Sequence, residues 1–370
     1  MRFCVFSSDP LYKYYHKGEI RTRYWNPKDL FDEVTVFSFC DRDIEPDKVQ
    51  TLVGRARLEI IPLGYPRLTN LVRQYRNAWD KLRALSPDLV RVHSPWHGIV
   101  GVRCSVKLGI PVLLSLHTHY GARRLFEPGL KLQALKAFEW YCVSKSDAVL
   151  AVSQYVAEYA RTMGAENISV IYNRVYGTQF CKGSSPSNVR PVVLSVGRLD
   201  PPKNQECLIR AIVDLDVQLV LVGDGVNRPA LESLADDLGL RDRVDFRGFL
   251  QHGQLPEVYQ CADIFAIATN YEGFCIPVLE AMASGLPIIA SDTPPIPEIM
   301  GGCGVIVKQT PEAFRNAILT LVRDSESALA MGNAARRRAR EIDGSLQEEK
   351  EAELYLSLAK CSSPASLKRK

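Results

Sequence analysis

The sequence has no apolar run long enough to cross a membrane. A transmembrane helix needs about 20 consecutive apolar residues, whereas the longest apolar stretches here, such as Val217–Val222, have the length of a β-strand. The first residues, Met1–Phe6, are mostly apolar and are followed at once by polar ones, which predicts a β-strand and not a signal peptide. We therefore expect a cytoplasmic protein.

The sequence also lacks an excess of one charge and any pattern of metal-binding cysteines. Its 370 residues contain 46 Lys and Arg against 42 Asp and Glu, so the net charge is only +4. Nucleic-acid-binding proteins usually carry a larger and patterned basic excess. The ten cysteines include no Cys-x-x-Cys pair, which favours reduced core thiols over disulfides or a zinc site. We expect neither a nucleic acid partner nor a structural metal.

Short apolar runs alternate with helical patterns through the first half of the chain. Runs rich in Val, Ile and Leu suit strands that are buried on both faces of a parallel sheet, and their alternation with helices is typical of βαβ units. Helical patterns cover residues 69–84 and 98–108. The predicted strands are 2–7, 34–39, 58–62, 89–93, 112–116 and 148–153.

The alternation stops at residues 177–190, which are rich in Gly, Ser and Pro and predict a linker. It then starts again with predicted strands at 192–196, 218–222, 243–247, 264–268, 287–291 and 304–307. The prediction is an α/β fold with two doubly wound parallel-sheet domains, 1–176 and 191–345, that face each other across a cleft. Residues 346–370 are predicted to form a C-terminal helix and a disordered tail.

Ligands of open α/β sheets bind at the loops that follow the strands, and two such loops of the second half carry charge. Arg198 and Lys203 follow the strand 192–196. Two cations in such a loop suit a diphosphate, although solvated surface cations are the alternative. Gly223-x-Gly225 follows the next strand, but Arg228 stands where a dinucleotide-binding turn needs its third glycine.

The strongest motif is Glu272-x7-Glu280, in the setting Glu-Gly-Phe-Cys-Ile-Pro-Val-Leu-Glu-Ala-Met-Ala-Ser-Gly-Leu-Pro. A strand precedes it, and a helix is predicted to begin near Pro277, so both carboxylates can face one pocket. A carboxylate at such a place suits sugar hydroxyls, which donate hydrogen bonds to it. Glu280 is flanked by apolar residues and needs a partner if it is buried.

This pattern resembles the signature of retaining glycosyltransferases of family 4, which have the GT-B fold of two Rossmann-like domains. The match is dense over 191–307 and thinner in the first half, at 87–94 and 114–117. Further matches in the family's order are Gly197-Arg198-Leu199 with Lys203, Gly223-Asp224-Gly225, Val244–Gly248 and Tyr259–Asp263.

The resemblance implies a catalytic set of His117, Arg198, Lys203 and Glu272. Arg198 and Lys203 would hold the donor diphosphate, and Glu280 would bind the nucleotide ribose. His117 would lie beneath the reacting sugar, although its apolar strand alone would suit a core histidine. Glu272 would hold the donor sugar together with Gly273, Phe274, Cys275 and Ile276. Gly197, Gly223, Gly225, Gly248 and Phe249 would complete the donor site, and the C-terminal helix would cross to the first domain.

One departure concerns the loop after the first strand, where the family usually has paired glycines. Gly18 is the only glycine there, and we assign it the phosphate-facing role. The surrounding residues 12–25 are rich in Tyr, Lys and Arg. Such a surface suits sugars, an anionic acceptor or a lipid interface, or is an ordinary solvated face.

Metal-dependent sugar transfer would need an Asp-x-Asp pair at a strand end. Asp41-x-Asp43 follows a predicted strand and stays open as an alternative, whereas Asp214-x-Asp216 lies at the wrong end of its sheet. Because Arg198 and Lys203 can hold the diphosphate, we expect neither a metal nor a cofactor besides the donor.

The sequence therefore predicts a retaining, metal-independent glycosyltransferase that takes its sugar from a nucleotide diphosphate sugar. The acceptor stays open between a glycan, a lipid-linked sugar and a small molecule, and so does peripheral contact with a membrane. The alternatives are a nicotinamide-dependent oxidoreductase with two Rossmann-like domains and an inactive nucleotide-sugar-binding subunit. The missing third glycine speaks against the first, and the retained motif residues speak against the second.

Overall fold

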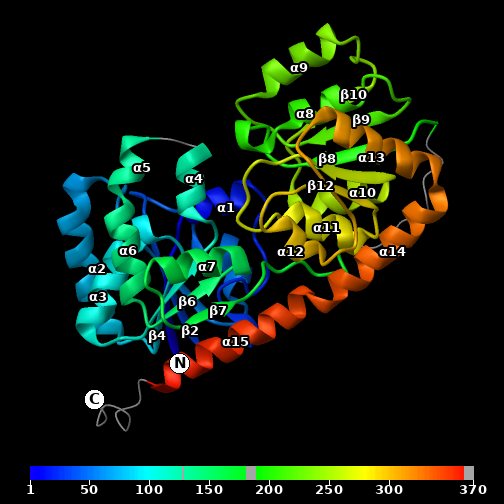
Figure 1. Ribbon diagram of the computed structural model, residues 1–370. Coiled ribbons are helices and arrows are strands. Elements are labelled where there is room, and N and C mark those ends of the chain that lie inside the picture. Colours follow the sequence, from blue (N-terminus) through cyan, green and yellow to red (C-terminus); the bar gives the residue numbers. More distant parts are fainter. Residues whose placement is uncertain (127–128, 181–188, 362–370) are drawn as a thin grey trace. The chain divides into compact units, whose positions relative to one another are not determined.

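The computed structural model describes residues 1–126, 129–180 and 189–361. The chain forms two compact units (Figure 1). The first consists of Met1–Tyr172 and the segment that begins at Leu346, and the second is Asn173–Ser345. Residues 181–188 of the predicted linker and the predicted tail from Ser362 lie outside the described residues.

The described part of the first unit contains a seven-stranded parallel sheet in the order β3-β2-β1-β4-β5-β6-β7. Strands β1, β2, β4, β5 and β6 are buried on both faces, as the continuous apolar runs predict, whereas the edge strands β3 and β7 are partly exposed. The three-residue strand β7 was not predicted, because it is too short and too polar to stand out. The strands are β1 (Arg2–Phe6), β2 (Glu33–Ser38), β3 (Arg57–Pro62), β4 (Leu89–Val92), β5 (Val112–Leu116), β6 (Ala148–Ala151) and β7 (Ile168–Val170).

Helices α2, α3 and α6 of this unit lie side by side (Figure 1). Helix α7 begins where the Ser153 side chain accepts a hydrogen bond from the backbone N–H of Val156, at 3.2 Å. The helices are α1 (Leu11–His16), α2 (Leu71–Leu85), α3 (Pro95–Leu108), α4 (Tyr120–Phe126), α5 (Leu130–Ala134), α6 (Lys136–Lys145), α7 (Gln154–Thr162) and α15 (Gly344–Cys361).

The C-terminal helix α15 packs into the core of the first unit. The buried ring of Tyr355 lies 5.2 Å from Phe3 and 6.0 Å from Phe31, measured between ring centroids. Arg91, which is buried in β4, forms an ion pair with Glu351 and also bonds the Tyr355 hydroxyl. A buried charge is tolerated only with such partners, so this network fixes the position of the helix on the sheet.

The described part of the second unit contains a six-stranded parallel sheet in the order β10-β9-β8-β11-β12-β13. Both sheets are thus doubly wound, as predicted. The strands are β8 (Val192–Val196), β9 (Gln218–Val222), β10 (Val244–Gly248), β11 (Ile264–Ile267), β12 (Ile288–Ser291) and β13 (Val305–Val307). The helices are α8 (Gln205–Ala211), α9 (Arg228–Asp237), α10 (Leu255–Gln260), α11 (Ile276–Ser284), α12 (Ile296–Met300), α13 (Pro311–Arg323) and α14 (Ser325–Glu341).

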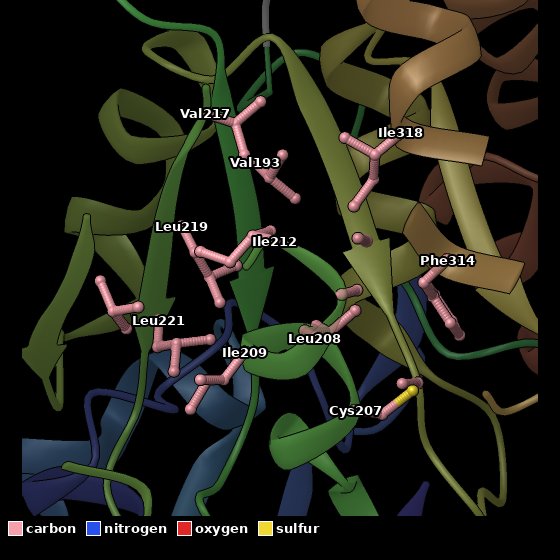
Figure 2. Close-up of a cluster of buried hydrophobic side chains, with 14 of the residues drawn as sticks. Val193, Cys207, Leu208, Ile209, Ile212, Val217, Leu219, Leu221, Phe314 and Ile318 are labelled. Atoms are coloured by element: carbon pink, nitrogen blue, oxygen red, sulfur yellow. The ribbon is translucent and has the colours of Figure 1, made fainter. Parts of the chain in front are cut away.

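The core of this unit lies between the sheet and helices α8 and α13. Figure 2 shows Ile209 of α8, and Ile212 just after this helix, beside Leu219 and Leu221 of β9, with Phe314 contributed by α13. All of these side chains are fully buried. The apolar faces of the amphipathic helices therefore cover the sheet and leave the loops at the strand ends to carry chemistry.

The start of the predicted linker is not a free connection. The backbone N–H of Gly177 donates to Asp343, at 2.9 Å. The ring of Phe180 is buried and meets the rings of His252 and Tyr259 edge-on. The polar composition of 177–190 did not indicate this contact, because it depends on a single aromatic residue, Phe180.

Candidate functional site

Each sheet has one switch point, where the strand order reverses, and ligands of doubly wound sheets bind in the crevice at that point. In the second unit it lies between β8 and β11, and in the first between β1 and β4. The loop after β8 carries Arg198 and Lys203, and the loop after β11 carries Glu272. The predicted donor-side residues therefore belong to the two loops of one switch point.

The structure joins Lys203 to Glu272. The Lys203 ammonium donates to the Glu272 carboxylate at 2.5 Å, and the two side chains are 19% and 9% exposed. Burial lowers the pKa of Lys203, but Glu272 outweighs it, so the net pKa is raised. The two loops are also joined directly, because the N–H of Asn270 and the hydroxyl of Thr269 donate to the carbonyl of Pro202. The pair is thus a held, charged lysine beside a carboxylate.

The Arg198 side chain is not part of this pair. It is 72% exposed and forms an ion pair with Asp200, while its backbone carbonyl accepts a hydrogen bond from Gln205 at 2.8 Å. Arg198 nevertheless lies close enough to Lys203 to act against the protonated form of that lysine. Its guanidinium therefore belongs to the same electropositive loop and stands open to solvent.

Glu280 lies on α11 and has partners of its own. Its carboxylate is 3% exposed, accepts from the Tyr259 hydroxyl at 2.8 Å, and lies 3.2 Å from Nε2 of His252. Burial and then Glu280 raise the pKa of Tyr259 well above its usual value, so the phenol stays a donor. The sequence predicts that Glu280 needs a partner if it is buried, and these hydrogen bonds compensate for the cost of burying its charge.

The two carboxylates have different partners, because Glu272 pairs with Lys203 and Glu280 with Tyr259. One pocket shared by both carboxylates stays a prediction. His252 was missed by sequence reasoning. It follows β10 within a 3₁₀ turn, and no pattern of spacing links it to Glu280. Tyr259 lay in a segment that matches the family, but its contact with Glu280 depends on how α10 packs against α11.

The glycines after β9 serve close packing of backbone on backbone. A Cβ atom at Gly223 would lie 2.0 Å from the carbonyl oxygen of Gly197, and one at Gly225 would lie 2.5 Å from that of Leu199. The N–H of Leu199 donates to the carbonyl of Asp224 at 2.9 Å. Gly223 and Gly225 therefore hold the loop after β9 against the loop after β8. Gly197 has open space on its Cβ side.

The remaining predicted donor residues flank these loops. Gly248 ends β10 with a positive φ of 70°, and the Phe249 side chain after it is 55% exposed. Cys275 precedes α11 and has a φ of 70°, a strained value for a residue with a side chain. It stands between Gly273-Phe274 and the first helical residue, Ile276, and it is buried. Burial, and then Glu272, raise the pKa of the Cys275 thiol well above its usual value.

In the first unit His117 follows β5 and pairs with His93, which follows β4. Nε2 of His117 lies 3.3 Å from Nδ1 of His93, and the rings are stacked with centroids 5.4 Å apart. Burial, and then Arg91, lower the pKa of His117 to about 4, and the same causes lower the pKa of His93 well below its usual value. Both imidazoles are therefore neutral near pH 7 and can form hydrogen bonds without carrying a charge.

His117 and His93 line a cavity of about 900 Å³ in the first unit. Ser8, which follows β1, lines the same cavity, so the cavity opens at the switch point of this sheet. His119 is used elsewhere: its Nδ1 accepts from the N–H of Ala122 at 2.9 Å, and its ring stacks on Tyr155 and Tyr159. It contributes to the start of α4.

Gly18, for which a phosphate-facing role is predicted, lies at a helix end, and that role stays a prediction. This residue has a φ of 65° and lies just after the C-terminal end of α1, where its N–H donates to the carbonyl of Tyr15. The C-terminal end of a helix presents carbonyl oxygens and a partial negative charge, which repel a phosphate. Gly18 therefore ends a helix, a use of glycine that the sequence did not distinguish from a ligand loop.

In the aspartate pair Asp41-x-Asp43, Asp43 has a local structural role. The Asp43 carboxylate accepts hydrogen bonds from the N–H groups of Leu11, Tyr12 and Ile44, each at 2.8 Å, and from the Ser38 hydroxyl at 2.5 Å. It holds the start of α1 against the end of β2. The residues that the structure describes contain no cluster of three or more His, Cys, Asp or Glu side chains that could hold a metal ion.

Two family models match the chain, one on each half. The model "Glycosyltransferase Family 4" matches residues 29–175, and the model "Glycosyl transferases group 1" matches residues 182–338. No helix in the described residues combines the length and the apolar character that a membrane span requires.

Curated relatives and solved structures agree with these models. A GDP-mannose-dependent alpha-mannosyltransferase of Mycolicibacterium smegmatis is 30% identical over 64% of this chain and 62% of its own length. An alpha-D-kanosaminyltransferase of Streptomyces kanamyceticus is 34% identical over 59% of this chain and 63% of its own. The chain thus spans less than two thirds of the length of either relative.

Sucrose-phosphate synthase from Thermosynechococcus elongatus superposes with a TM-score of 0.79 at 20% identity, over 97% of this chain and 99% of its own. HepE from Anabaena, solved with UDP, superposes with a TM-score of 0.78 at 21% identity, over 96% of this chain and 99% of its own. These likenesses establish the fold. With the two parallel sheets they show the GT-B fold. By the two family models, which together match most of its length, this chain belongs to glycosyltransferase family 4.

Proposed function

We propose that this chain is a retaining glycosyltransferase that moves a sugar from a nucleotide diphosphate sugar to an acceptor hydroxyl. The observation that carries the proposal is the partly buried Lys203–Glu272 pair at the switch point of the second unit. In this proposal the donor diphosphate takes Lys203 as its counterion and meets the exposed guanidinium of Arg198. Two cations then stabilise the negative charge that develops on the departing phosphate.

The proposal gives each carboxylate a separate task. Glu272, released from part of its contact with Lys203, accepts hydrogen bonds from donor sugar hydroxyls beside the backbone of 273–276. Glu280, oriented by Tyr259, accepts from the hydroxyls of the ribose. Neither carboxylate is assigned the role of a covalent nucleophile. The acceptor's proton passes to a donor phosphate oxygen, so that bond formation and leaving-group departure occur on the same face and the anomeric configuration is kept.

The first unit supplies the acceptor side. Because His117 and His93 are neutral, they can orient a hydroxyl without attracting the donor phosphate. Cations take the place of a metal ion in this scheme, so we propose that activity needs no divalent cation. We place the enzyme in the cytoplasm. The names of the relatives make GDP-mannose and UDP-glucose the first donors to test.

The test is a mass-spectrometric screen of donor hydrolysis and transfer over nucleotide sugars, with and without EDTA. We expect turnover of at least one donor, unaffected by EDTA, and an NMR spectrum of the product with the anomeric configuration of the donor. Inversion would overturn the retaining mechanism. Loss of activity with EDTA that Mn²⁺ restores would overturn metal independence. Nucleotide binding without any turnover would support the inactive binding subunit instead.

A further inference from the structure

A buried arginine lies close to the histidine pair of the first unit. Arg91 precedes His93 by two residues along β4, and Ser115 precedes His117 by two residues along β5. Side chains two residues apart along a strand point to the same face of the sheet. Nε of Arg91 donates to the Ser115 hydroxyl at 2.8 Å, and Nδ1 of His93 lies 3.3 Å from Nε2 of His117. Two successive polar contacts therefore join the ends of the two strands, and the second contact is the histidine pair.

The C-terminal helix α15 holds the charge of Arg91. The guanidinium forms an ion pair with Glu351 and bonds the hydroxyl of Tyr355, which itself donates to Glu351 at 2.7 Å. The Arg91 and Glu351 side chains are only 3% and 6% exposed. The guanidinium also lies over the Tyr355 ring, 5.7 Å from its centroid. The polar contacts of α15 thus continue through Arg91 to the strand end that carries His93.

The core around Arg91 would suit an apolar residue. Leu89, two residues before it, and Leu113, its partner in the register of β4 and β5, belong to the cluster that includes Phe3 and Tyr355. Apolar residues of similar volume are often at least as stabilising as a buried ion pair, because the desolvation of both charges offsets their attraction. Stability alone therefore does not account for a charge at this position, whereas its contact next to the histidine pair suggests a role in the site.

We propose that Arg91 is a positioning residue for His117, and that the C-terminal helix holds it in place through Glu351. The contact of Arg91 with Ser115 fixes the end of β4 against the end of β5. This spacing keeps His93 within hydrogen-bond distance of His117, so that one imidazole orients the other. The inference rests on the proposed function, because that function assigns His117 to the acceptor side.

The groups that face the two imidazoles set the direction of the test. Burial and then Arg91 lower the pKa of both histidines, whereas Glu351 acts in the opposite direction on His117. The rings of Tyr24 and Trp25 face its partner histidine, with centroids 5.9 Å and 6.1 Å away. Of the two charges, Arg91 has the larger influence on His117. Removing both charges should therefore raise the pKa of His117.

Two double variants compare this network with a matched one in the same unit. Arg91→Met with Glu351→Gln removes both charges beside the histidines. Arg124→Met with Glu139→Gln removes the charges of a second buried triad, in which Arg124 donates to Glu139 at 2.7 Å and to Tyr159 at 2.8 Å. Neutral side chains of similar size leave no unpaired buried charge, which is the costly case. Circular dichroism checks that both double variants fold.

Nitrogen-15 NMR of the imidazoles reports position and charge without any substrate. In the wild-type chain we expect His117 to show one tautomer, because its Nε2 shares one proton with His93. In the Arg91 double variant we expect both tautomers, and a pKa of His117 that rises from about 4 to about 5. The Arg124 double variant should give the wild-type spectrum, and loss of signals in His117→Asn identifies the ring. No change in the Arg91 double variant, or equal changes in both, would overturn the proposal.

A milder pair of variants applies if removal of the charges prevents folding. Ser115→Ala deletes the hydroxyl that accepts from Arg91 and leaves both charges in place. Ser105→Ala is the matched control, because Ser105 is equally buried in the same unit and its hydroxyl has no hydrogen-bond partner among the described residues. We expect Ser115→Ala alone to populate both tautomers of His117 and to slow transfer about fivefold, the scale of one lost hydrogen bond. A single tautomer and an unchanged rate in Ser115→Ala would overturn the proposal.

Turnover of the donor separates this inference from the proposed function. We expect the Arg91 double variant to transfer sugar about tenfold more slowly at unchanged nucleotide affinity, through lost orientation of the acceptor. If the NMR changes occur as expected but the wild-type chain turns over no nucleotide sugar, Arg91 still positions His117 and the proposed transferase fails. If the wild-type chain and the double variant transfer sugar equally fast with identical His117 spectra, the transferase stands and the positioning role of Arg91 is wrong.

Discussion

The two units have the same strand order around their switch points but opposite kinds of side chain there. In the second unit the loops after β8 and β11 carry an ammonium and a carboxylate that are held together at 2.5 Å. In the first unit the loop after β4, the counterpart of β11, carries His93, which stacks on His117. Burial keeps those two imidazoles neutral. One topology therefore presents fixed charges in one unit and neutral hydrogen-bonding groups in the other.

The difference indicates how a duplicated architecture can divide labour. A diphosphate leaving group needs cations that do not have to move when charge develops. An incoming hydroxyl needs orientation and would gain nothing from a nearby imidazolium that competes for the phosphate. The contrast makes each unit testable by itself.

The largest effect should come from removing the charge of the second unit. We expect Lys203→Ala to lower kcat by ~10²–10³, the scale for the loss of one preorganised donor to a developing negative charge. Lys308→Ala is the matched control, because Lys308 is exposed in the same unit. Steady-state kinetics with the best donor measure the effect. Equal activity of the two variants would show that the Lys203–Glu272 pair is structural and remove the main support for the proposed donor site.

The next largest effect should come from the neutral pair. We expect His117→Ala to lower the rate of transfer by about 10²-fold through lost orientation of the acceptor. The affinity for the nucleotide, which the proposal assigns to the second unit, should change little. His16→Ala is the control, since that histidine is exposed in the same unit. If calorimetry instead finds a large loss of nucleotide affinity in His117→Ala, the division between the two units is wrong.

A smaller effect should follow from Glu280, which has a neutral partner although it lies in the charged unit. We expect Glu280→Gln to weaken nucleotide binding about tenfold, the scale for one lost hydrogen bond to a charged group. The amide can still accept from Tyr259, so the fold should persist. Glu312→Gln, at an exposed position of α13, is the control. An unchanged Kd for the nucleotide would assign Glu280 to the packing of α10 on α11.

The sequence predicts the strands of both sheets better than it predicts the contacts between side chains. The parallel sheets follow from runs such as Val112–Leu116, because burial on both faces leaves only apolar residues. Lys203 and Glu272 could be predicted as neighbours, since each follows a strand at the same switch point. The contacts of His252 with Glu280 and of Phe180 with His252 could not, because they join residues whose proximity depends on helix packing and not on strand order.

The glycines show most clearly which features depend on tertiary structure and not on sequence pattern. The donor-site roles of Gly18, Gly197 and Gly223 stay predictions; in the structure Gly18 ends a helix and Gly223 packs on the backbone of Gly197. A missing side chain is required equally at a helix end, at a close approach of two loops and beside a ligand. Only the positions of the neighbouring atoms distinguish these three uses, and those positions are set by tertiary structure.

The smallest effect, on stability and not on rate, separates the two units by pH. The pKa of His117 is about 4 in the folded chain and about 6.5 in an unfolded one. The unfolded state therefore binds the proton first as the pH falls, so the first unit loses stability below pH 6.5 and continues to lose it down to about pH 4. For this one group the loss between pH 6.5 and 5.5 is ~1 kcal/mol.

Lys203 behaves in the opposite way: its raised pKa stabilises the second unit throughout this range, and that stability is lost only as the pH rises through the lysine's pKa. Hydrogen–deuterium exchange, corrected for the intrinsic rate at each pH, should show core strands of the first unit losing protection on acidification. His117→Asn, but not His16→Asn, should reduce that loss by the share that His117 contributes, while His93, whose pKa is also lowered, continues to contribute its own. If His117→Asn left the acid loss unchanged, the imidazole would already be protonated in the folded state, and the contrast between a charged unit and a neutral one would fail.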